Sequence, residues 1–284
     1  MKTLSIGING GATHTTARLI VAGNAFGDPA EAGPSNPRTI GVDRAALAIA
    51  GVFRAVQATM PPWGVLDIVA AGVAGTGVPS RHEALKGAVE AIIEREIHLC
   101  TDAEAALWAA APEGPALILI AGTGSIAWGR TADGRLERAG GLGADGGDPG
   151  SATRIGNDAR EAALREHISP ELAGMLQKRD RQVPAATLAV EIDRLAESGD
   201  PTAQTILRSA AEALALMARD AWVKLGRPDE IPFALTGGVL THSTLVRRFL
   251  GVALEDCGVR LRPYVLETPP EVGAVAHAAA MRAR

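Results

Sequence analysis

Two apolar segments of this chain each end at a glycine-rich turn and then continue as a second strand-like segment. Residues 4–9 stop at Asn9-Gly10-Gly11, and the strongly apolar residues 116–121 stop at Gly122-Thr123-Gly124-Ser125. Short apolar runs bounded by turn residues are typical of buried strands, and a short glycine-containing connection between two such runs predicts a β-hairpin. The layout of strand, glycine turn, strand and then helix therefore occurs near the start of the chain and again near its middle.

The rest of the sequence predicts an α/β protein built on this repeat. Apolar periodicity and turn residues predict helices at 43–59, 80–96, 104–111, 243–254 and 271–282, and further strands at 68–73, 97–100, 232–236 and 259–261. Residues 138–156 are predicted to form a long glycine-rich loop, and the chain is expected to be mainly helical after it.

The repeat predicts two α/β domains of related topology that face each other across a cleft. We place the domains at residues 1–104 and 105–284, and we expect the last helix, about 271–284, to pack back on the first domain. One large α/β domain is the alternative, because 284 residues fit either arrangement.

Composition excludes several classes of function. The net charge of −4, the scattered Lys and Arg residues and the 3% aromatic content offer neither a basic surface nor a stacking platform for nucleic acid. No apolar run approaches the roughly 20 residues of a membrane span, and the apolar start is broken at Asn9-Gly10-Gly11, which argues against a signal peptide. The two cysteines, Cys100 and Cys257, fit no metal-ligand spacing, so we expect reduced thiols in a cytoplasmic protein.

The two glycine turns have the chemistry of phosphate-binding turns. Glycines let a ligand approach the backbone closely, and successive backbone N–H groups form a concave site for an anion. Thr13, Thr15, Thr123 and Ser125 add hydroxyl groups. A plain hairpin turn is the alternative for Asn9-Gly10-Gly11 alone, but one such turn in each domain predicts a phosphate clamp. Neither turn has the Lys of a P-loop, and neither opens directly into a helix as a dinucleotide-binding turn does.

Several motifs along the whole chain give a more specific resemblance. They are Gly33-Pro34-Ser35-Asn36-Pro37, Ala71-Gly72-Val73-Ala74-Gly75, Thr101-Asp102-Ala103, Ile120 to Ala127, Arg138 to Gly141, Gly147-Asp148-Pro149-Gly150-Ser151, Thr236 to Val239 and Pro269-Pro270-Glu271-Val272-Gly273-Ala274. With the two turns, they resemble the BadF/BadG/BcrA/BcrD ATPase family of the actin-like ATPase superfamily, to which N-acetylglucosamine kinase and bacterial glucosamine kinases belong. The resemblance implies two actin-like, ribonuclease H-like α/β domains around a nucleotide and sugar cleft.

The resemblance also implies roles for individual residues, with ATP and Mg²⁺ as cofactors. Asp102 falls at the position of the catalytic base, and a carboxylate there can take the proton of a sugar hydroxyl that attacks the γ-phosphoryl group. The implied sugar-binding residues are Asn36, Asp102, Gly140, Gly141 and Asp148. The implied nucleotide-binding residues are Gly10, Gly11, Thr13, Thr15, Gly122, Thr123, Gly124 and Ser125 for the phosphates, and Gly237 and Gly238 for the adenosine.

Ordinary structural roles remain open for the three polar residues of that set. Asp102 directly precedes a helical run and could be its N-cap, a role compatible with catalysis. Asn36 could form an Asx turn before Pro37, and Asp148 could be a turn former among glycines.

Three departures from the family pattern bear on activity. Asn9 stands where the family usually has the Asp that helps to hold hydrated Mg²⁺, so Asn9 is at most a weak metal contact through water. Ala12 and His14 replace the Gly or Lys more usual around that turn, and Pro149 replaces a Glu that contacts the sugar in relatives. A weakened or non-catalytic homologue is therefore an alternative, although Asp102 and the second turn are intact.

The function expected from the resemblance is ATP-dependent phosphorylation of an amino sugar, N-acetylglucosamine or glucosamine, at the C6 hydroxyl. N-Acetylmuramic acid and glucose stay open as substrates. The alternatives are an ATPase that switches a protein partner and a sugar sensor without catalysis. The family branch that holds an iron–sulfur cluster is excluded, because such clusters need several Cys ligands. A homodimer is expected because it is common among relatives.

Overall fold

The chain divides into two compact units, each with its own sheet. The computed structural model describes residues 2–141, 148–164, 168–178 and 183–283. Met1–Glu113 together with Leu266–Arg284 form the first unit, and Gly114–Val265 form the second. The alternative of one large α/β domain is therefore wrong.

The first unit is built on a five-stranded mixed sheet of order β3-β2-β1-β4-β5. Its strands are β1 (Lys2–Gly10), β2 (Thr15–Val21), β3 (Asn24–Ala32), β4 (Gly64–Val73) and β5 (His98–Cys100). Its helices are α1 (Pro37–Ile40), α2 (Val42–Ala58), α3 (Pro79–Ile93), α4 (Asp102–Ala110) and α11 (Pro270–Arg282). β1 and β2 form the predicted antiparallel hairpin, whereas β1, β4 and β5 run parallel.

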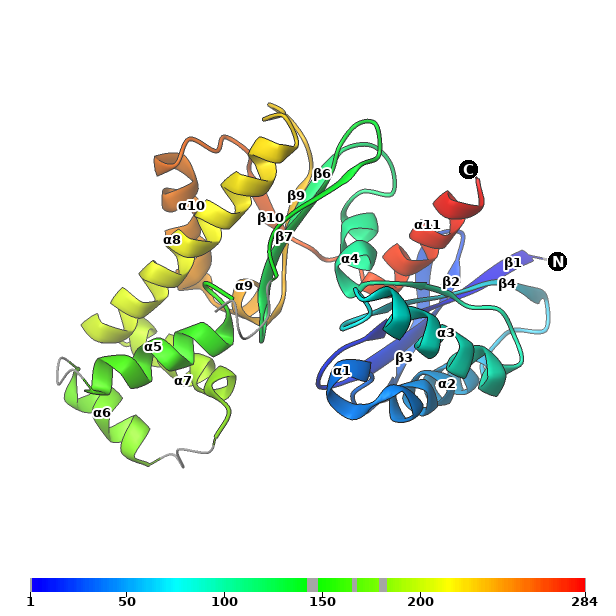
Figure 1. The fold of residues 1–284 in the computed structure, drawn as a ribbon, viewed down its shortest axis with the longest axis horizontal. Helices are drawn as coiled ribbons and strands as arrows, with labels where there is room; N and C mark the ends of the chain where they lie inside the picture. Colours follow the sequence, from blue (N-terminus) through cyan, green and yellow to red (C-terminus); the bar gives the residue numbers. More distant parts are fainter. Residues whose placement is uncertain (1, 142–147, 165–167, 179–182, 284) are drawn as a thin grey trace. The chain divides into compact units, whose positions relative to one another are not determined.

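Helices cover both faces of this sheet (Figure 1). α2 and α3 pack together over one face, where Leu4, Ile6 and Ile8 of β1 are fully buried with Phe53 of α2. α4 and α11 pack together over the other face. Because successive side chains of a strand point to opposite faces, the residues between these leucine and isoleucine positions, such as Gly7 and Asn9, face α4 and α11.

Helix α11 sits unusually close to its neighbours in the first unit. A Cβ atom on Gly273 would lie 1.8 Å from the carbonyl oxygen of Ala105 in α4, and one on Gly7 would lie 2.1 Å from the carbonyl oxygen of Glu271. Both positions therefore accept only glycine. His98 of β5 also contacts His277 of α11: Nε2 of His98 lies 2.7 Å from Nδ1 of His277.

We expect a Gly273→Val variant to lose stability, because the added side chain overlaps the backbone of α4. Overpacking of this kind costs about 1–3 kcal/mol, which for domains of this size lowers the melting temperature by roughly 2–10 °C. Thermal unfolding followed by circular dichroism measures the change. Gly87→Ala in α3 is the matched control, because no atom lies within 4 Å of a Cβ atom there and Ala favours a helix. A melting temperature of Gly273→Val equal to that of wild type would contradict the packing described.

The second unit repeats the topology of the first. Its sheet has the order β10-β9-β6-β7-β8, with β6 (Ala116–Ala121), β7 (Ser125–Arg130), β8 (Leu136–Gly140), β9 (Phe233–Thr236) and β10 (Pro263–Val265). Its helices are α5 (Ala152–Leu164), α6 (Pro170–Gln177), α7 (Ala185–Glu197), α8 (Pro201–Lys224), α9 (Gly238–His242) and α10 (Thr244–Asp256). β6 pairs antiparallel with β7 and parallel with β9, as β1 pairs with β2 and β4.

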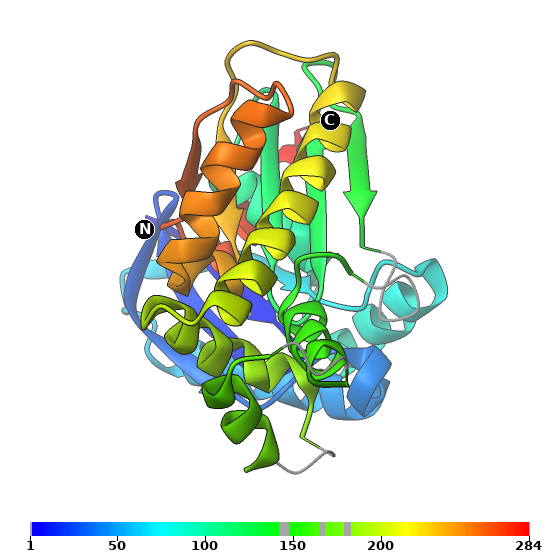
Figure 2. The same ribbon diagram turned by 90° about the vertical axis from the view of Figure 1, so that its left-hand side faces the viewer.

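The core of the second unit lies between this sheet and its long helices. α8 and α10 run side by side over one face (Figure 2), where Leu117, Leu119 and Leu235 are buried against them. Even α8, with 24 residues, is buried along one side only, because its buried residues recur every three to four positions. In the described parts of the chain, we find no helix with both the length and the apolar character needed to cross a membrane.

Several predicted elements differ from the structure, mainly at sheet edges. Residues 138–156 are not all loop, because β8 extends to Gly140 and α5 starts at Ala152. The last strand is Pro263–Val265 rather than 259–261, since Val259 and Leu261 are buried in the core without joining the strand. β3 was not predicted. β3 and β8 pair on one side only. Most residues of β3 are exposed and β8 buries only Ala139, so both strands lack the apolar pattern that identifies central strands.

Candidate active site

The first glycine turn is fixed to the loop that precedes α1. The backbone N–H groups of Ser35 and Asn36 both donate to the carbonyl oxygen of Gly11, each at 3.1 Å. The Thr15 hydroxyl, fully buried, donates to the carbonyl oxygen of Gly33 at 2.7 Å. The turn expected to hold phosphate and the loop expected to contact sugar thus form one connected structure. Thr15 serves this connection rather than pointing its hydroxyl outward.

The two glycine positions of this turn differ in their surroundings. Neither Gly10 nor Gly11 has a positive φ. A Cβ atom on Gly10 would lie 2.3 Å from the Ser35 hydroxyl oxygen, so packing inside the unit requires glycine there. A Cβ atom on Gly11 would meet only the carbonyl oxygen of His14, at 3.3 Å, and would otherwise face open space. Gly11 therefore leaves the backbone accessible to a ligand.

Asp102 is the first residue of α4, and it is not the N-cap. Thr101 caps the helix: its hydroxyl accepts from the N–H of Glu104 at 3.1 Å, and the Glu104 carboxylate accepts from the N–H of Thr101 at 2.8 Å. The proposed capping role of Asp102 is therefore wrong. With Thr101 and Glu104 in a complete capping box, the carboxylate of Asp102 is left for another role.

The environment of Asp102 favours a base stronger than an ordinary carboxylate. Burial raises the pKa of the Asp102 carboxyl group, the backbone N–H groups of Ala103 and Asp102 oppose this shift, and the nearby Glu104 carboxylate adds to it. A raised pKa brings a carboxylate closer to the operating pH, where general-base catalysis is most efficient.

Topology brings Asp102 and the first turn to one edge of the sheet. The parallel strands pair Gly10 with Val73 and Gly72 with Cys100, so the carboxyl ends of β1, β4 and β5 lie together. Ligands of open α/β sheets bind outside this edge. A Cβ atom on Gly72, the register partner of Asn9, would lie 2.4 Å from the Cβ atom of Ala105. The side chain of Asn9 therefore faces the side of the sheet on which α4 begins.

The second glycine turn is held by loops of the second unit. The N–H of Ala152, at the start of α5, donates to the carbonyl oxygen of Gly122 at 2.8 Å. The Ser125 hydroxyl donates to the carbonyl oxygen of Pro149 at 2.7 Å, and the N–H of Gly141 donates to the carbonyl oxygen of Ser125 at 3.1 Å. Ser125 therefore fixes the turn to two loops with its side chain and its backbone.

Asp148 and the turn after β9 lie beside the same glycines. A Cβ atom on Gly124 would lie 2.6 Å from Oδ2 of Asp148, and one on Gly122 would have the backbone nitrogen of Gly238 as its nearest atom, at 3.9 Å. The second unit thus gathers the predicted phosphate turn, Asp148 and the predicted adenosine turn. Thr123 is exposed at the tip, and Asp148 has a positive φ of 29°, a conformation that Asp tolerates better than most residues.

Glycine is required by the fold at some of these positions and not at others. Gly140, Gly141 and Gly237 have φ values of 73°, 66° and 88°, which already explains glycine there. Gly122 and Gly238 have neither a positive φ nor a close neighbour. The fold itself would accept a side chain at these two positions, so packing within the unit does not explain glycine there.

Asn36 and Thr13, the remaining polar residues of the predicted site, each make a local contact with a neighbouring residue. Oδ1 of Asn36 accepts from the N–H of Arg38 at 2.9 Å and caps α1, which confirms the Asx turn, and the residue is half-buried. Thr13 is exposed, with its hydroxyl 2.9 Å from Nδ1 of His14. Gly147 of the matched motif lies outside the described residues. Prediction from sequence missed Ser35 and Glu271, although both stand inside motifs that carried the resemblance.

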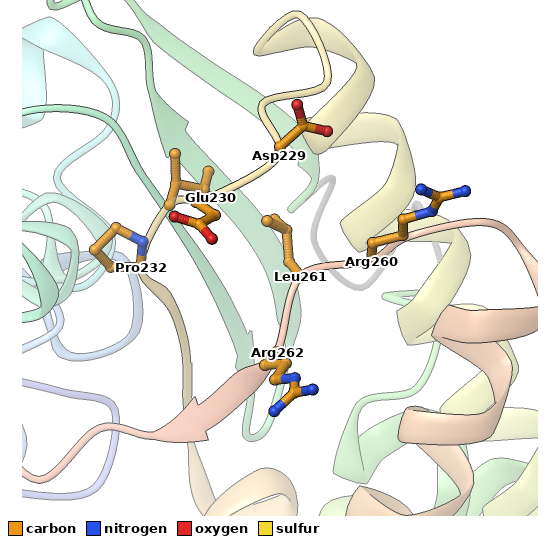
Figure 3. Close-up of a pocket in the computed structure, with 7 residues that line it drawn as sticks. Asp229, Glu230, Pro232, Arg260, Leu261 and Arg262 are labelled. Atoms are coloured by element: carbon orange, nitrogen blue, oxygen red, sulfur yellow. The ribbon is translucent and has the colours of Figure 1, made fainter.

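A separate surface pocket of about 430 Å³ lies at the opposite edge of the second sheet. It is lined by the segments that lead into β9 and β10, at the amino ends of these parallel strands. Asp229 and Arg262 extend from the backbone in opposite directions (Figure 3). The pocket lacks converging polar groups and lies away from the glycine turns, so it does not compete with them as the nucleotide site.

The BadF/BadG/BcrA/BcrD ATPase family matches residues 6–276 of the chain. The chain belongs to this family. The resemblance predicted from the motifs is confirmed, and so is the two-domain α/β fold, because solved relatives align over the whole chain. An N-acetylmuramic acid/N-acetylglucosamine kinase of Clostridium acetobutylicum is 44% identical over 70 residues, which are 25% of this chain and 23% of that protein. The match spans about a quarter of the curated relative.

Solved structures of proteins described as sugar kinases align with nearly all of the chain. A candidate N-acetylglucosamine kinase of Chromobacterium violaceum aligns with a TM-score of 0.73 and 27% identity over 96% of this chain and 97% of that one. A second candidate N-acetylglucosamine kinase, from Porphyromonas gingivalis, has a TM-score of 0.77 and 18% identity over 98% and 99%. A ROK family glucokinase of Streptomyces griseus has a TM-score of 0.68 and 20% identity over 99% and 100%. These relatives support the predicted enzyme class, an ATP-dependent sugar kinase.

Proposed function

We propose that this protein transfers the γ-phosphoryl group of ATP to the C6 hydroxyl of an amino sugar, N-acetylglucosamine or glucosamine. The environment and position of Asp102 carry the proposal. Asp102 is free of a capping role, has a raised pKa because of burial, and lies at the same sheet edge as the first glycine turn. Family membership and the kinases among its relatives support the choice of substrate class.

In this proposal, each group has a defined task. The oxygen of the sugar hydroxyl attacks the γ-phosphorus, and Asp102 accepts the proton of that hydroxyl. The bond between the γ-phosphorus and the oxygen that bridges it to the β-phosphate breaks, so ADP leaves. The open backbones at Gly11 and Gly122 hold the phosphates, and Gly238 leaves room for the adenosine. Asn36, whose oxygen caps α1, offers its amide N–H groups to a sugar hydroxyl, and Asp148 accepts from another.

The residues around the first turn fit a magnesium ion carried by the nucleotide. Within the described residues, no three His, Cys, Asp or Glu side chains are placed to hold a metal ion. Mg²⁺ needs no such cage, because it keeps several waters and binds through one or two carboxylates and the substrate phosphates. Asn9 supplies an amide oxygen on the side of the sheet where α4 begins. When bound, Mg²⁺ neutralises charge that develops on the phosphates.

A panel of sugars tests the proposal directly. Release of ADP from Mg-ATP is measured with glucosamine, N-acetylglucosamine, N-acetylmuramic acid and glucose, and without sugar. We expect stimulation by one of the first two sugars. A basal rate unchanged by every sugar supports instead an ATPase that switches a protein partner. Sugar binding by calorimetry without ADP release at any Mg²⁺ concentration supports a sensor, the outcome that Asn9 and Pro149 would favour.

The homodimer and the cytoplasmic location likewise stay predictions. Size-exclusion chromatography with light scattering tests the homodimer.

A further inference from the structure

The first unit contains a buried carboxylate that the proposed mechanism does not use. Glu271 lies in the first turn of α11 and is 3% exposed. Its Oε1 atom accepts a hydrogen bond from the Thr16 hydroxyl at 2.5 Å. No described Lys, Arg or His forms an ion pair with it. A carboxylate buried without a positive partner is costly, and one hydroxyl with the amino end of a helix offsets only part of that cost.

Glu271 is hydrogen-bonded to the cross-strand partner of Asn9, the position at which the first turn lacks a charge. Thr16 is the register partner of Asn9 across the β1–β2 ladder, and side chains of such partners lie on one face with their Cβ atoms roughly 4.5–5.5 Å apart. The hydrogen bond from Thr16 therefore brings the Glu271 carboxylate to the neighbourhood of the Asn9 amide.

A second contact places Glu271 on the same face independently. A Cβ atom on Gly7 would lie 2.1 Å from the carbonyl oxygen and 3.0 Å from the Cβ atom of Glu271. Gly7 and Asn9 are two residues apart in β1, so their side-chain positions face the same side of the sheet. The first turn of α11 thus covers the face toward which Asn9 points, close to the carboxyl edge where Asp102 begins α4.

We propose that Glu271 supplies the negative charge toward the Mg²⁺ of Mg-ATP that Asn9 cannot supply. The inference rests on the proposed function for the identity of the ligand. It explains both anomalies at once, a neutral residue at the metal side of the turn and a buried carboxylate without a cation. Oxygen donors are the ligands that Mg²⁺ prefers, and moving the carboxylate from β1 to the start of α11 keeps one such donor beside the phosphates. Thr16 orients this carboxylate.

Binding of Mn²⁺ and ADP tests the assignment without any turnover. Mn²⁺ replaces Mg²⁺ and is followed by electron paramagnetic resonance in the presence of ADP, and ADP binding in EDTA is followed by calorimetry. For Glu271→Gln we expect about 10- to 100-fold weaker Mn²⁺ binding to the ADP complex, the range seen when groups that support a metal site are removed. ADP binding in EDTA should be unchanged. Glu267→Gln, an exposed acid just before α11, is the control and should match wild type.

A charge-relocation pair separates this role from a purely structural one. Asn9→Asp combined with Glu271→Gln should restore Mn²⁺ affinity to within a few fold of wild type, because the carboxylate returns to β1. If Glu271→Gln proves unstable, Thr16→Val, which removes only the orienting hydroxyl, should also weaken Mn²⁺ binding. Unchanged Mn²⁺ binding in Glu271→Gln, or no recovery in the double variant, would overturn the proposal. Failure of the sugar panel alone would not, since these binding experiments contain no sugar.

Discussion

We expect Asp102→Asn to abolish most phosphoryl transfer while the protein stays folded and still binds nucleotide. The amide keeps the size of the carboxylate but cannot accept the proton of the attacking hydroxyl, and loss of a general base costs about 100- to 10,000-fold in rate. ADP release at saturating sugar measures the first effect, and calorimetric titration with ADP measures the second. Turnover close to that of wild type in Asp102→Asn would refute the base assignment.

The raised pKa of Asp102 adds a prediction on stability and pH. Because burial raises this pKa, the ionised side chain opposes folding above the pKa, and the neutral amide of Asp102→Asn should be at least as stable as wild type at pH 7 to 8. Activity needs the ionised base, so kcat/KM should fall as the pH drops through a value above that of an ordinary Asp. The Glu104 carboxylate adds to the shift, so Glu104→Gln should retain activity and move this acid limb to lower pH.

Gly122→Ala should separate nucleotide binding from folding. A Cβ atom there meets no protein atom closer than 3.9 Å, and Gly122 has no positive φ, so we expect a melting temperature without ligand close to that of wild type. The same Cβ atom would occupy space assigned to a phosphate. We expect ADP affinity to fall at least tenfold, which corresponds to about 1.4 kcal/mol. Calorimetry or the ADP-induced shift in melting temperature measures this loss.

Gly251→Ala is the matched control for that experiment. It changes a glycine in α10 of the same unit, also without a neighbour within 4 Å of the Cβ position, and it should bind ADP like wild type and be equally or more stable. Wild-type ADP affinity in Gly122→Ala would mean that the second turn does not hold the nucleotide.

Much of this fold could be predicted because central strands carry a strong local signal. The apolar runs before Gly10 and Gly122 predict both hairpins, and the sheets reproduce the repeated layout. Edge strands such as β3 and β8 carry no such signal, since they pair on one side and bury almost none of their residues: β3 has no buried residue and β8 buries only Ala139. Their positions depend on the neighbouring strand, which a local pattern does not contain.

The candidate site shows the same division between local and long-range information. Glycine turns and Asp102 are visible as short motifs. The cap at Thr101 depends on Glu104 three residues later, a local signal that could have been used. The contact between Glu271 and Thr16 spans 255 residues of sequence, and the need for glycine at position 10 comes from Ser35. Such contacts arise only once the sheet has assembled.

Identification of the phosphorylated product is the most direct test of the proposed function. The protein is incubated with Mg-ATP and with glucosamine or N-acetylglucosamine, and the products are followed by phosphorus NMR and mass spectrometry. The proposal predicts a sugar 6-phosphate formed in equal amount to ADP, and its loss in Asp102→Asn. Inorganic phosphate in equal amount to ADP, with no sugar phosphate for either sugar, would contradict it.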